Sequence, residues 1–151
     1  DTERILTTAK GNLQSVKSAL SFLYLQRGTP CIYYGTELAL IGGPDPDCRR
    51  DMPWERVSAD NDMLNFMKEL IQLRKEVAGM IQYGKVSLEE VELDILAVEW
   101  RYEGQLLKAY FNHSKKDVVL EREQADLISL GSISDDQLVI QPNGFVIYRE
   151  D

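Results

Sequence analysis

The stretch that most constrains the fold spans 28–54, where a short apolar run opens into a long polar loop. Residues 31–34 are β-branched, aromatic or cysteine, and Pro30 and Gly35 bound them. A continuous apolar run of this length predicts a strand over 30–35 that is buried on both faces, as in a parallel sheet.

The loop after this run concentrates charge. Its charged and aromatic residues include Asp45, Asp47, Arg49, Arg50, Asp51 and Trp54. Loops of this length without secondary structure are uncommon unless they are functional or disordered. Parallel α/β folds keep their sites at the carboxyl ends of their strands, so this loop is the first candidate for a functional site.

Length and charge limit the class of protein. At 151 residues the chain can form one large domain or two small ones. The formal charge of −8 argues against nucleic acid and against an anionic membrane surface, because no basic stripe offers phosphate contacts. No apolar run approaches the roughly 20 residues that cross a bilayer.

The charge and the hydrophobic period both change near Gly79. Residues 1–78 hold 10 Lys/Arg and 11 Asp/Glu, whereas residues 79–151 hold 7 and 14. The apolar period shifts from 3.6 to 2 at the same place. We therefore predict two domains, 1–78 and 79–151.

The first domain is predicted to contain a helix, the strand described above and a second helix. Apolar residues recur at helical spacing over 12–27, with Asn12 as the N-cap and Gly28 in the left-handed position that follows. The second helix is predicted over 60–78. Its candidate caps are Ser58 and Asp60.

The second domain is predicted to be a compact antiparallel β-sandwich, because short alternating strands are separated by turn signals. The predicted strands are 85–92, 95–102, 106–112, 117–120, 127–130, 138–141 and 145–149.

Three segments of the first domain match a known family. Residues 31–37 (CIYYGTE) and 42–54 (GGPDPDCRRDMPW) resemble the α-amylase superfamily, glycoside hydrolase family 13. The second string is most similar to the neopullulanase, cyclomaltodextrinase and maltogenic amylase branch. Residues 1–7 (DTERILT) look like the family's His-Asp-Thr-x-Arg segment, which follows the seventh barrel strand.

The resemblance implies an α+β fragment: the last helix-strand-helix part of a (β/α)8 TIM barrel, followed by the family's antiparallel β-sandwich, domain C. Residues 12–27 are similar to the seventh barrel helix, 30–35 to the eighth strand and 60–78 to the eighth helix. The chain begins at Asp1 without a preceding Met. We therefore expect it to be the C-terminal part of a longer polypeptide.

The resemblance also implies a function for the parent enzyme. It would be a retaining α-glucan hydrolase that cleaves α-1,4 and some α-1,6 glucosidic bonds in cyclodextrins, pullulan or maltooligosaccharides. The nucleophilic Asp and the acid/base Glu belong to barrel strands outside this sequence, so the isolated chain is expected to be inactive. The sequence leaves open whether the full-length enzyme forms a homodimer.

Three residues are the predicted site residues. Asp1 takes the position of the family's third carboxylate, which stabilises the transition state by hydrogen bonds to sugar hydroxyls. Asp45 and Arg49 take the positions of an Asp-x-x-x-Arg pair that binds glucose hydroxyls, which carboxylate and guanidinium groups do well. The alternatives are a frayed terminal charge at Asp1 and a surface salt bridge between Asp45 and Arg49.

Neighbouring residues receive structural interpretations. Glu37 is expected to tie loop backbone amides together. Tyr33 and Tyr34 are expected to alternate, one inside the barrel and one against its helices. Trp54 either stacks on a sugar face or packs the loop against the barrel.

No metal or cofactor is expected. Cys31 and Cys48 make neither a disulfide framework nor a metal pattern, and are interpreted as reduced thiols of a cytoplasmic protein. His113 is the single histidine. It has no second His or Cys nearby in the sequence, which argues against a zinc site.

A function of another class is a non-catalytic carbohydrate-binding, structural or dimerisation β-sandwich. Sugar binding would need exposed aromatic side chains on one sheet face. The candidates are Trp100, Tyr102, Tyr110 and Phe111.

Overall fold

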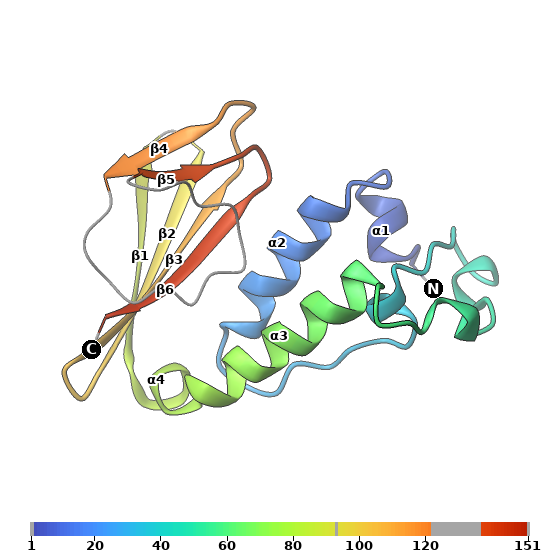
Figure 1. Cartoon of the computed structure of the whole chain (residues 1–151), viewed down its shortest axis with the longest axis horizontal. Coiled ribbons are helices and arrows are strands. Elements are labelled where there is room, and N and C mark those ends of the chain that lie inside the picture. Colours follow the sequence, from blue (N-terminus) through green and yellow to red (C-terminus); the bar gives the residue numbers. More distant parts are fainter. Residues whose placement is uncertain (1, 93, 122–136, 151) are drawn as a thin grey trace. The chain divides into compact units, whose positions relative to one another are not determined.

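The computed structural model describes residues 2–92, 94–121 and 137–150 (Figure 1). Contacts divide the chain into two units. The N-terminal unit comprises residues up to 24 together with 29–72, and the sheet unit comprises 25–28 and the chain from 73 onward. The predicted domains 1–78 and 79–151 remain a prediction. None of the helices in the described ranges is long and apolar enough to span a bilayer.

The N-terminal unit contains α1 (Ile5–Thr8), α2 (Leu13–Tyr24) and the first part of α3 (Asp62–Glu76). Three single 3-10 turns, Thr36–Leu38, Asp47–Arg49 and Trp54–Arg56, lie in the long connection between α2 and α3.

The start of α2 agrees with the prediction, whereas the start of α3 does not. The Ser15 amide donates to Oδ1 of Asn12 at 3.0 Å, which confirms Asn12 as the N-cap. At α3 the cap is Asn61, whose Oδ1 accepts from the Leu64 amide at 2.9 Å. The cap is therefore neither of the predicted residues, Ser58 and Asp60.

Each of the two long helices buries one apolar face. The buried residues of α2 and of α3 within this unit include Val16, Leu20, Tyr24, Met63, Phe66, Met67 and Leu70. Lys17 of α2 donates to Asp62 of α3 at 2.7 Å, and its ammonium also lies 5.3 Å from the centre of the Phe66 ring.

The predicted strand at 30–35 is wrong. Residues 30–33 form no ladder, and a turn follows at Tyr34 and Gly35. The side chains of Cys31, Tyr33 and Tyr34 are exposed rather than buried. A strand exists only when its backbone groups pair with a neighbour, and no described segment pairs with this run.

The sheet unit follows the predicted pattern. After α4 (Ala78–Tyr83), the strands are β1 (Lys85–Glu92), β2 (Ile95–Tyr102), β3 (Gln105–Asn112), β4 (Val118–Glu121), β5 (Gln137–Ile140) and β6 (Phe145–Glu150). β1, β2, β3 and β6 form one antiparallel sheet in that order, and β4 pairs with β5 in a second. The predicted strand at 127–130 lies outside the described residues.

The two sheets pack on each other (Figure 1). Leu138 and Ile140 of β5 contact Val146 and Tyr148 of β6, and Tyr110 of β3 joins this cluster. On the other face of the larger sheet, the buried side chains include Trp100, Leu107, Phe111, Phe145 and Ile147. The α+β class with antiparallel sheets is therefore confirmed, whereas the barrel part of the predicted fold remains a prediction.

Arginine side chains tie the segment 25–28 into the sheet unit. Arg74 donates to the carbonyls of Gln26 and Gly28, each at 2.6 Å. Burial lowers the pKa of Arg74. Gly28 has φ +98°, so the left-handed conformation predicted for this position is confirmed.

Candidate functional site

A cavity of about 600 Å³ lies in the N-terminal unit. Its lining residues are Thr2, Glu3, Arg4, Ile5, Tyr33, Thr36, Cys48 and Arg49. They come from the three segments that carry the sequence motifs, 1–7, 31–37 and 42–54. Segments far apart in the sequence therefore meet at one cavity, which is the candidate functional site.

Arg4 joins these three segments. Its side chain is only 4% exposed, and its Nε donates to the Cys48 carbonyl at 2.6 Å. One terminal nitrogen, Nη1, donates to the Tyr34 carbonyl. The Arg4 backbone amide donates to the Gly42 carbonyl at 2.9 Å. Its remaining nitrogen, Nη2, is buried and has no hydrogen-bond partner among the described residues.

The two tyrosines face the same guanidinium. Cζ of Arg4 lies 4.3 Å from the ring centre of Tyr33 and 4.5 Å from that of Tyr34. Such cation–π contacts favour a cation over the ring face. The predicted alternation of Tyr33 and Tyr34 to opposite sides is wrong, because this segment lacks the pleat of a strand.

The structure brings two of the three predicted site residues together. Nε of Arg49 lies 2.7 Å from Oδ1 of Asp45, and both side chains are substantially exposed. Arg49 lines the cavity, and the thiol of Cys48 lies 3.9 Å from the same Asp45 oxygen. Asp1, the third predicted site residue, lies outside the described residues.

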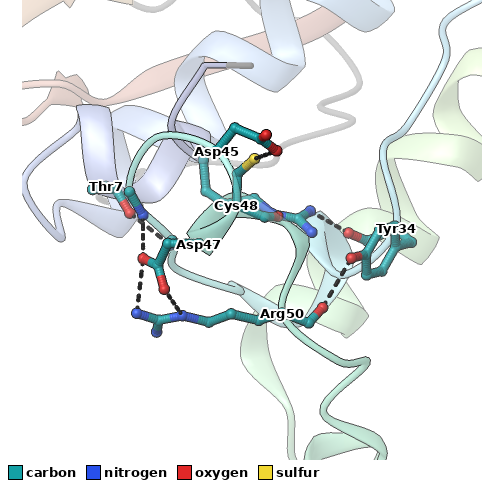
Figure 2. Close-up of polar contacts among 9 residues, drawn as sticks. Thr7, Tyr34, Asp45, Asp47, Cys48 and Arg50 are labelled. Carbon is teal, nitrogen blue, oxygen red and sulfur yellow. Dashed lines mark hydrogen bonds and ion pairs between the residues drawn. The ribbon is translucent and has the colours of Figure 1, made fainter.

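A second ion pair fixes the shape of the loop. Figure 2 shows Arg50 against Asp47, with Nε and Nη2 donating to the two carboxylate oxygens at 2.8 and 2.9 Å. The Gly43 amide also donates to Asp47 at 2.6 Å. These bonds from Arg50 and then from Gly43 stabilise the charged carboxylate, so the pKa of Asp47 is lowered. The Tyr34 hydroxyl donates to the Arg50 carbonyl at 2.9 Å (Figure 2).

Gly42 closes the loop at its start. Its amide donates to Oγ1 of Thr7 at 2.9 Å, and its carbonyl accepts from Arg4. A Cβ at this position would lie 2.6 Å from the Asp47 carbonyl oxygen. Only glycine lets the two ends of the loop approach this closely.

The structure bears on Glu37 in part and leaves both interpretations of Trp54 open. Oε2 of Glu37 is buried without a hydrogen-bond partner in the described part of the chain, so this oxygen does not tie loop amides together. The side chain of Trp54 is 72% exposed, so it is not packed away within this unit.

The structure also describes the two cysteines and two of the aromatic residues of the sheet unit. Cys31 and Cys48 are free thiols, as predicted. Across 2–92, 94–121 and 137–150, no group of three His, Cys, Asp or Glu residues is placed to hold a metal ion. Trp100 and Phe111 are 2% and 1% exposed, so neither offers the exposed ring that the carbohydrate-binding sandwich would need.

Sequence reasoning did not single out Arg4. Its only signal was its place in the Asp-Thr-x-Arg segment at 1–4. Charge pattern alone does not mark an arginine as buried, because arginine is mostly found on surfaces.

No family model matches the chain, but proteins of similar sequence and solved structures of similar fold were found. The intracellular maltogenic amylase of Bacillus subtilis is 31% identical over 97% of this chain and 27% of its own length. The cyclomaltodextrinase of Thermoanaerobacter pseudethanolicus is 34% identical over 99% of this chain and 27% of its own length. The crystal structure of a maltogenic amylase from S. marinus superposes with a TM-score of 0.78 at 27% identity, covering 100% of this chain and 21% of that one.

In this chain the motifs at 1–7, 31–37 and 42–54 line one cavity. In sequence and in fold the chain is similar to glycoside hydrolases of the α-amylase superfamily. Within it, the chain resembles proteins named maltogenic amylase, cyclomaltodextrinase and neopullulanase. It spans about a quarter of the length of the two curated relatives described above.

Proposed function

We propose that the chain is the C-terminal part of a retaining α-glucan hydrolase. The parent enzyme cleaves α-1,4 and some α-1,6 glucosidic bonds in cyclodextrins, pullulan or maltooligosaccharides. The observation that carries this proposal is the cavity where the three motif segments meet beside the Asp45–Arg49 pair. The names of the relatives agree with this substrate class.

The proposal divides the chemistry between this chain and the rest of the enzyme. Retaining hydrolysis needs a nucleophilic carboxylate and an acid/base carboxyl about 5–5.5 Å apart. Both belong to earlier barrel strands, so the isolated chain releases no sugar. Residues 1–78 complete the barrel, residues 79–151 form domain C, and Asp1 stabilises the transition state.

Within this chain, Asp45 and Arg49 hold the sugar. Both groups of this ion pair are substantially exposed, and Arg49 lines the cavity. The carboxylate accepts hydrogen bonds from hydroxyls on neighbouring sugar carbons, and the guanidinium donates in a fixed plane. The exposed pair is expected to contribute little to the stability of the fold.

The proposal includes a cytoplasmic location and no cofactor. The name of the B. subtilis relative, intracellular maltogenic amylase, supports the location. A homodimer of the complete enzyme is tested by light scattering on the complete protein.

The test compares binding variants with a matched ion-pair variant. In the complete protein, Asp45→Asn and Arg49→Met are expected to raise KM for maltotriose about tenfold each, because each removes hydrogen bonds to charged groups. Asp62→Asn breaks an exposed ion pair of the same 2.7 Å length outside the cavity lining and is expected to leave KM unchanged. An unchanged KM in both loop variants would refute the binding role.

A second measurement tests the division of labour. The isolated chain is incubated with β-cyclodextrin and with pullulan, and reducing ends are counted against a blank. Release above the blank would show that the chain carries its own nucleophile, which contradicts the proposal.

A further inference from the structure

We propose that Arg4 is the positioning residue of the sugar-binding loop: it holds the Cys48–Arg49 peptide and thereby sets the Asp45–Arg49 pair against the cavity. This inference rests on the proposed function, because it assumes that this pair binds sugar. It goes further by assigning the placement of the pair to a side chain outside the loop.

The contacts of Arg4 reach both ends of the loop. At the start, its backbone amide donates to the Gly42 carbonyl at 2.9 Å. Near the end, its Nε donates to the Cys48 carbonyl at 2.6 Å. That carbonyl belongs to the peptide bond that continues into Arg49. The loop between 42 and 48 is therefore held at two points by one residue.

The guanidinium is itself held in place. The rings of Tyr33 and Tyr34 lie 4.3 and 4.5 Å from its Cζ, and the Tyr34 carbonyl accepts from Nη1. Tyr34 in turn reaches the loop through its hydroxyl, which donates to the Arg50 carbonyl. The planar fork of arginine can bond two carbonyls in different directions while it stacks on both rings, whereas a lysine ammonium cannot.

The burial of Arg4 argues against a role as a general surface charge. Taking a guanidinium out of water is costly unless its N–H groups are paired, and Nη2 lacks a partner among the described residues. A site optimised only for stability would favour an apolar residue here. The position is explained if the arginine is needed to place the Cys48 carbonyl, and with it Arg49, at the cavity.

The experiment is a double-mutant cycle in the complete protein. Arg4→Met keeps the length of the side chain and removes its donors, and Arg49→Met removes the sugar-binding guanidinium. If Arg4 acts through Arg49, Arg4→Met raises KM for maltotriose about tenfold in the wild-type background and less than twofold in the Arg49→Met background. The turnover number kcat changes less than KM.

Two further variants separate positioning from folding. Arg4→Lys keeps the charge over the two rings but can bond only one of the carbonyls well, so it is expected to give an intermediate KM. Arg50→Met breaks the neighbouring ion pair to Asp47 and leaves the Arg4 contacts in place; it is expected to change KM less than Arg4→Met. Circular dichroism of each variant confirms folding, and if Arg4→Met does not fold, the cycle is run with Arg4→Lys.

Each outcome decides one question. Equal increases in KM from the Arg4 variant in both backgrounds, or a fall in thermal stability with KM unchanged, would overturn the positioning role while the binding role of Arg49 survives. If Arg49→Met alone leaves KM unchanged, the proposed function fails instead. A large effect of Arg4→Met that disappears in the Arg49→Met background supports the inference.

Discussion

The N-terminal unit and the sheet unit are stabilised in different ways. The sheet unit forms its own antiparallel ladders, and its largest side chains, including Trp100, Phe111 and Phe145, are almost fully buried. The long connection in the N-terminal unit, by contrast, has no ladder. Hydrogen bonds to its backbone from or to the side chains of Arg4, Asp47 and Tyr34 hold it in place. Its aromatic residues Tyr33 and Trp54 are exposed. The sheet unit therefore owes its shape to ladders and packing, whereas the connection between α2 and α3 owes its shape largely to a few polar contacts.

The largest expected effect comes from replacing each of the two tryptophans by alanine, which tests this difference between the units. Trp100→Ala empties a fully buried position in the larger sheet and is expected to cost about 3–5 kcal/mol of unfolding free energy. Trp54→Ala removes a ring that is 72% exposed and is expected to change stability by less than about 0.5 kcal/mol. Denaturant unfolding of the complete protein measures both. Equal costs would contradict the contrast between the units.

Asn112 is the polar exception inside the sheet unit. Its fully buried amide donates to the carbonyls of Lys116 and Ile140 at 2.8 and 2.7 Å and accepts from the Ser114 amide at 2.8 Å. Asn112→Ala removes these three hydrogen bonds from a buried position and is expected to cost about 2–3 kcal/mol. The control His113→Ala changes the exposed neighbour and is expected to be nearly neutral. A neutral Asn112→Ala would show that packing alone specifies this turn.

The same contacts exclude a modification that the sequence allows. Asn112, His113 and Ser114 form an Asn-x-Ser glycosylation pattern. Both hydrogens of the Asn112 amide are already donated to carbonyls, and the residue is fully buried. A glycosyltransferase cannot reach this nitrogen in the folded unit, so the pattern is structural here.

Substitutions of Gly42 and Gly43 test the close packing of the polar loop, and their expected effect on stability is of moderate size. A Cβ on Gly42 would lie 2.6 Å from the Asp47 carbonyl oxygen, whereas a Cβ on Gly43 would lie 3.4 Å from its nearest atom, the Asp47 side chain. Gly42→Ala is expected to cost about 1–3 kcal/mol through this overlap, and Gly43→Ala clearly less. Thermal unfolding and the amide exchange of 43–50 measure the effect. Similar behaviour of both variants would show that the loop can open without cost.

The sequence predicted the sheet unit better than the N-terminal unit for a physical reason. The alternation in 95–102 was enough to predict a strand, because the antiparallel partner of this segment follows directly along the chain. The run at 31–34 has the composition of a buried strand, but a strand needs neighbours, and no described segment supplies them. Composition shows that a segment is able to form a strand, but the strand forms only where another segment pairs with it.

In the candidate site, too, local contacts could be predicted from the sequence and contacts between distant residues could not. Asp45 and Arg49 are four residues apart in the chain, so their ion pair is a local contact. The contacts of Arg4 join residues 30 and 44 positions apart and depend on the fold of the connection between α2 and α3. The resemblance of the sequence to a known family therefore predicted the Asp45–Arg49 pair, whereas only the structure revealed the contacts of Arg4.

The smallest expected effect is a pH dependence of the loop. Hydrogen bonds from Arg50 and Gly43 lower the pKa of Asp47 below its ordinary value of about 4. A lowered pKa in the folded state stabilises the loop above the unfolded pKa, and this contribution is lost as the pH falls through the folded pKa. Because Asp47 and Arg50 are exposed, the loss is expected to be small and to be weakened further by salt.

The measurement follows the Asp47 carboxyl carbon and the amide of Gly43 by NMR between pH 2 and 6. Both are expected to titrate together, with a midpoint below that of a free aspartate. Asp47→Asn keeps an oxygen that can accept from Gly43 but removes the charge, so the amide shift of Gly43 is expected to lose its pH dependence. If Asp47 titrates at its ordinary value, the ion pair does not hold the loop, and the positioning of Asp45 and Arg49 then depends on the Arg4 contacts and on Gly42 alone.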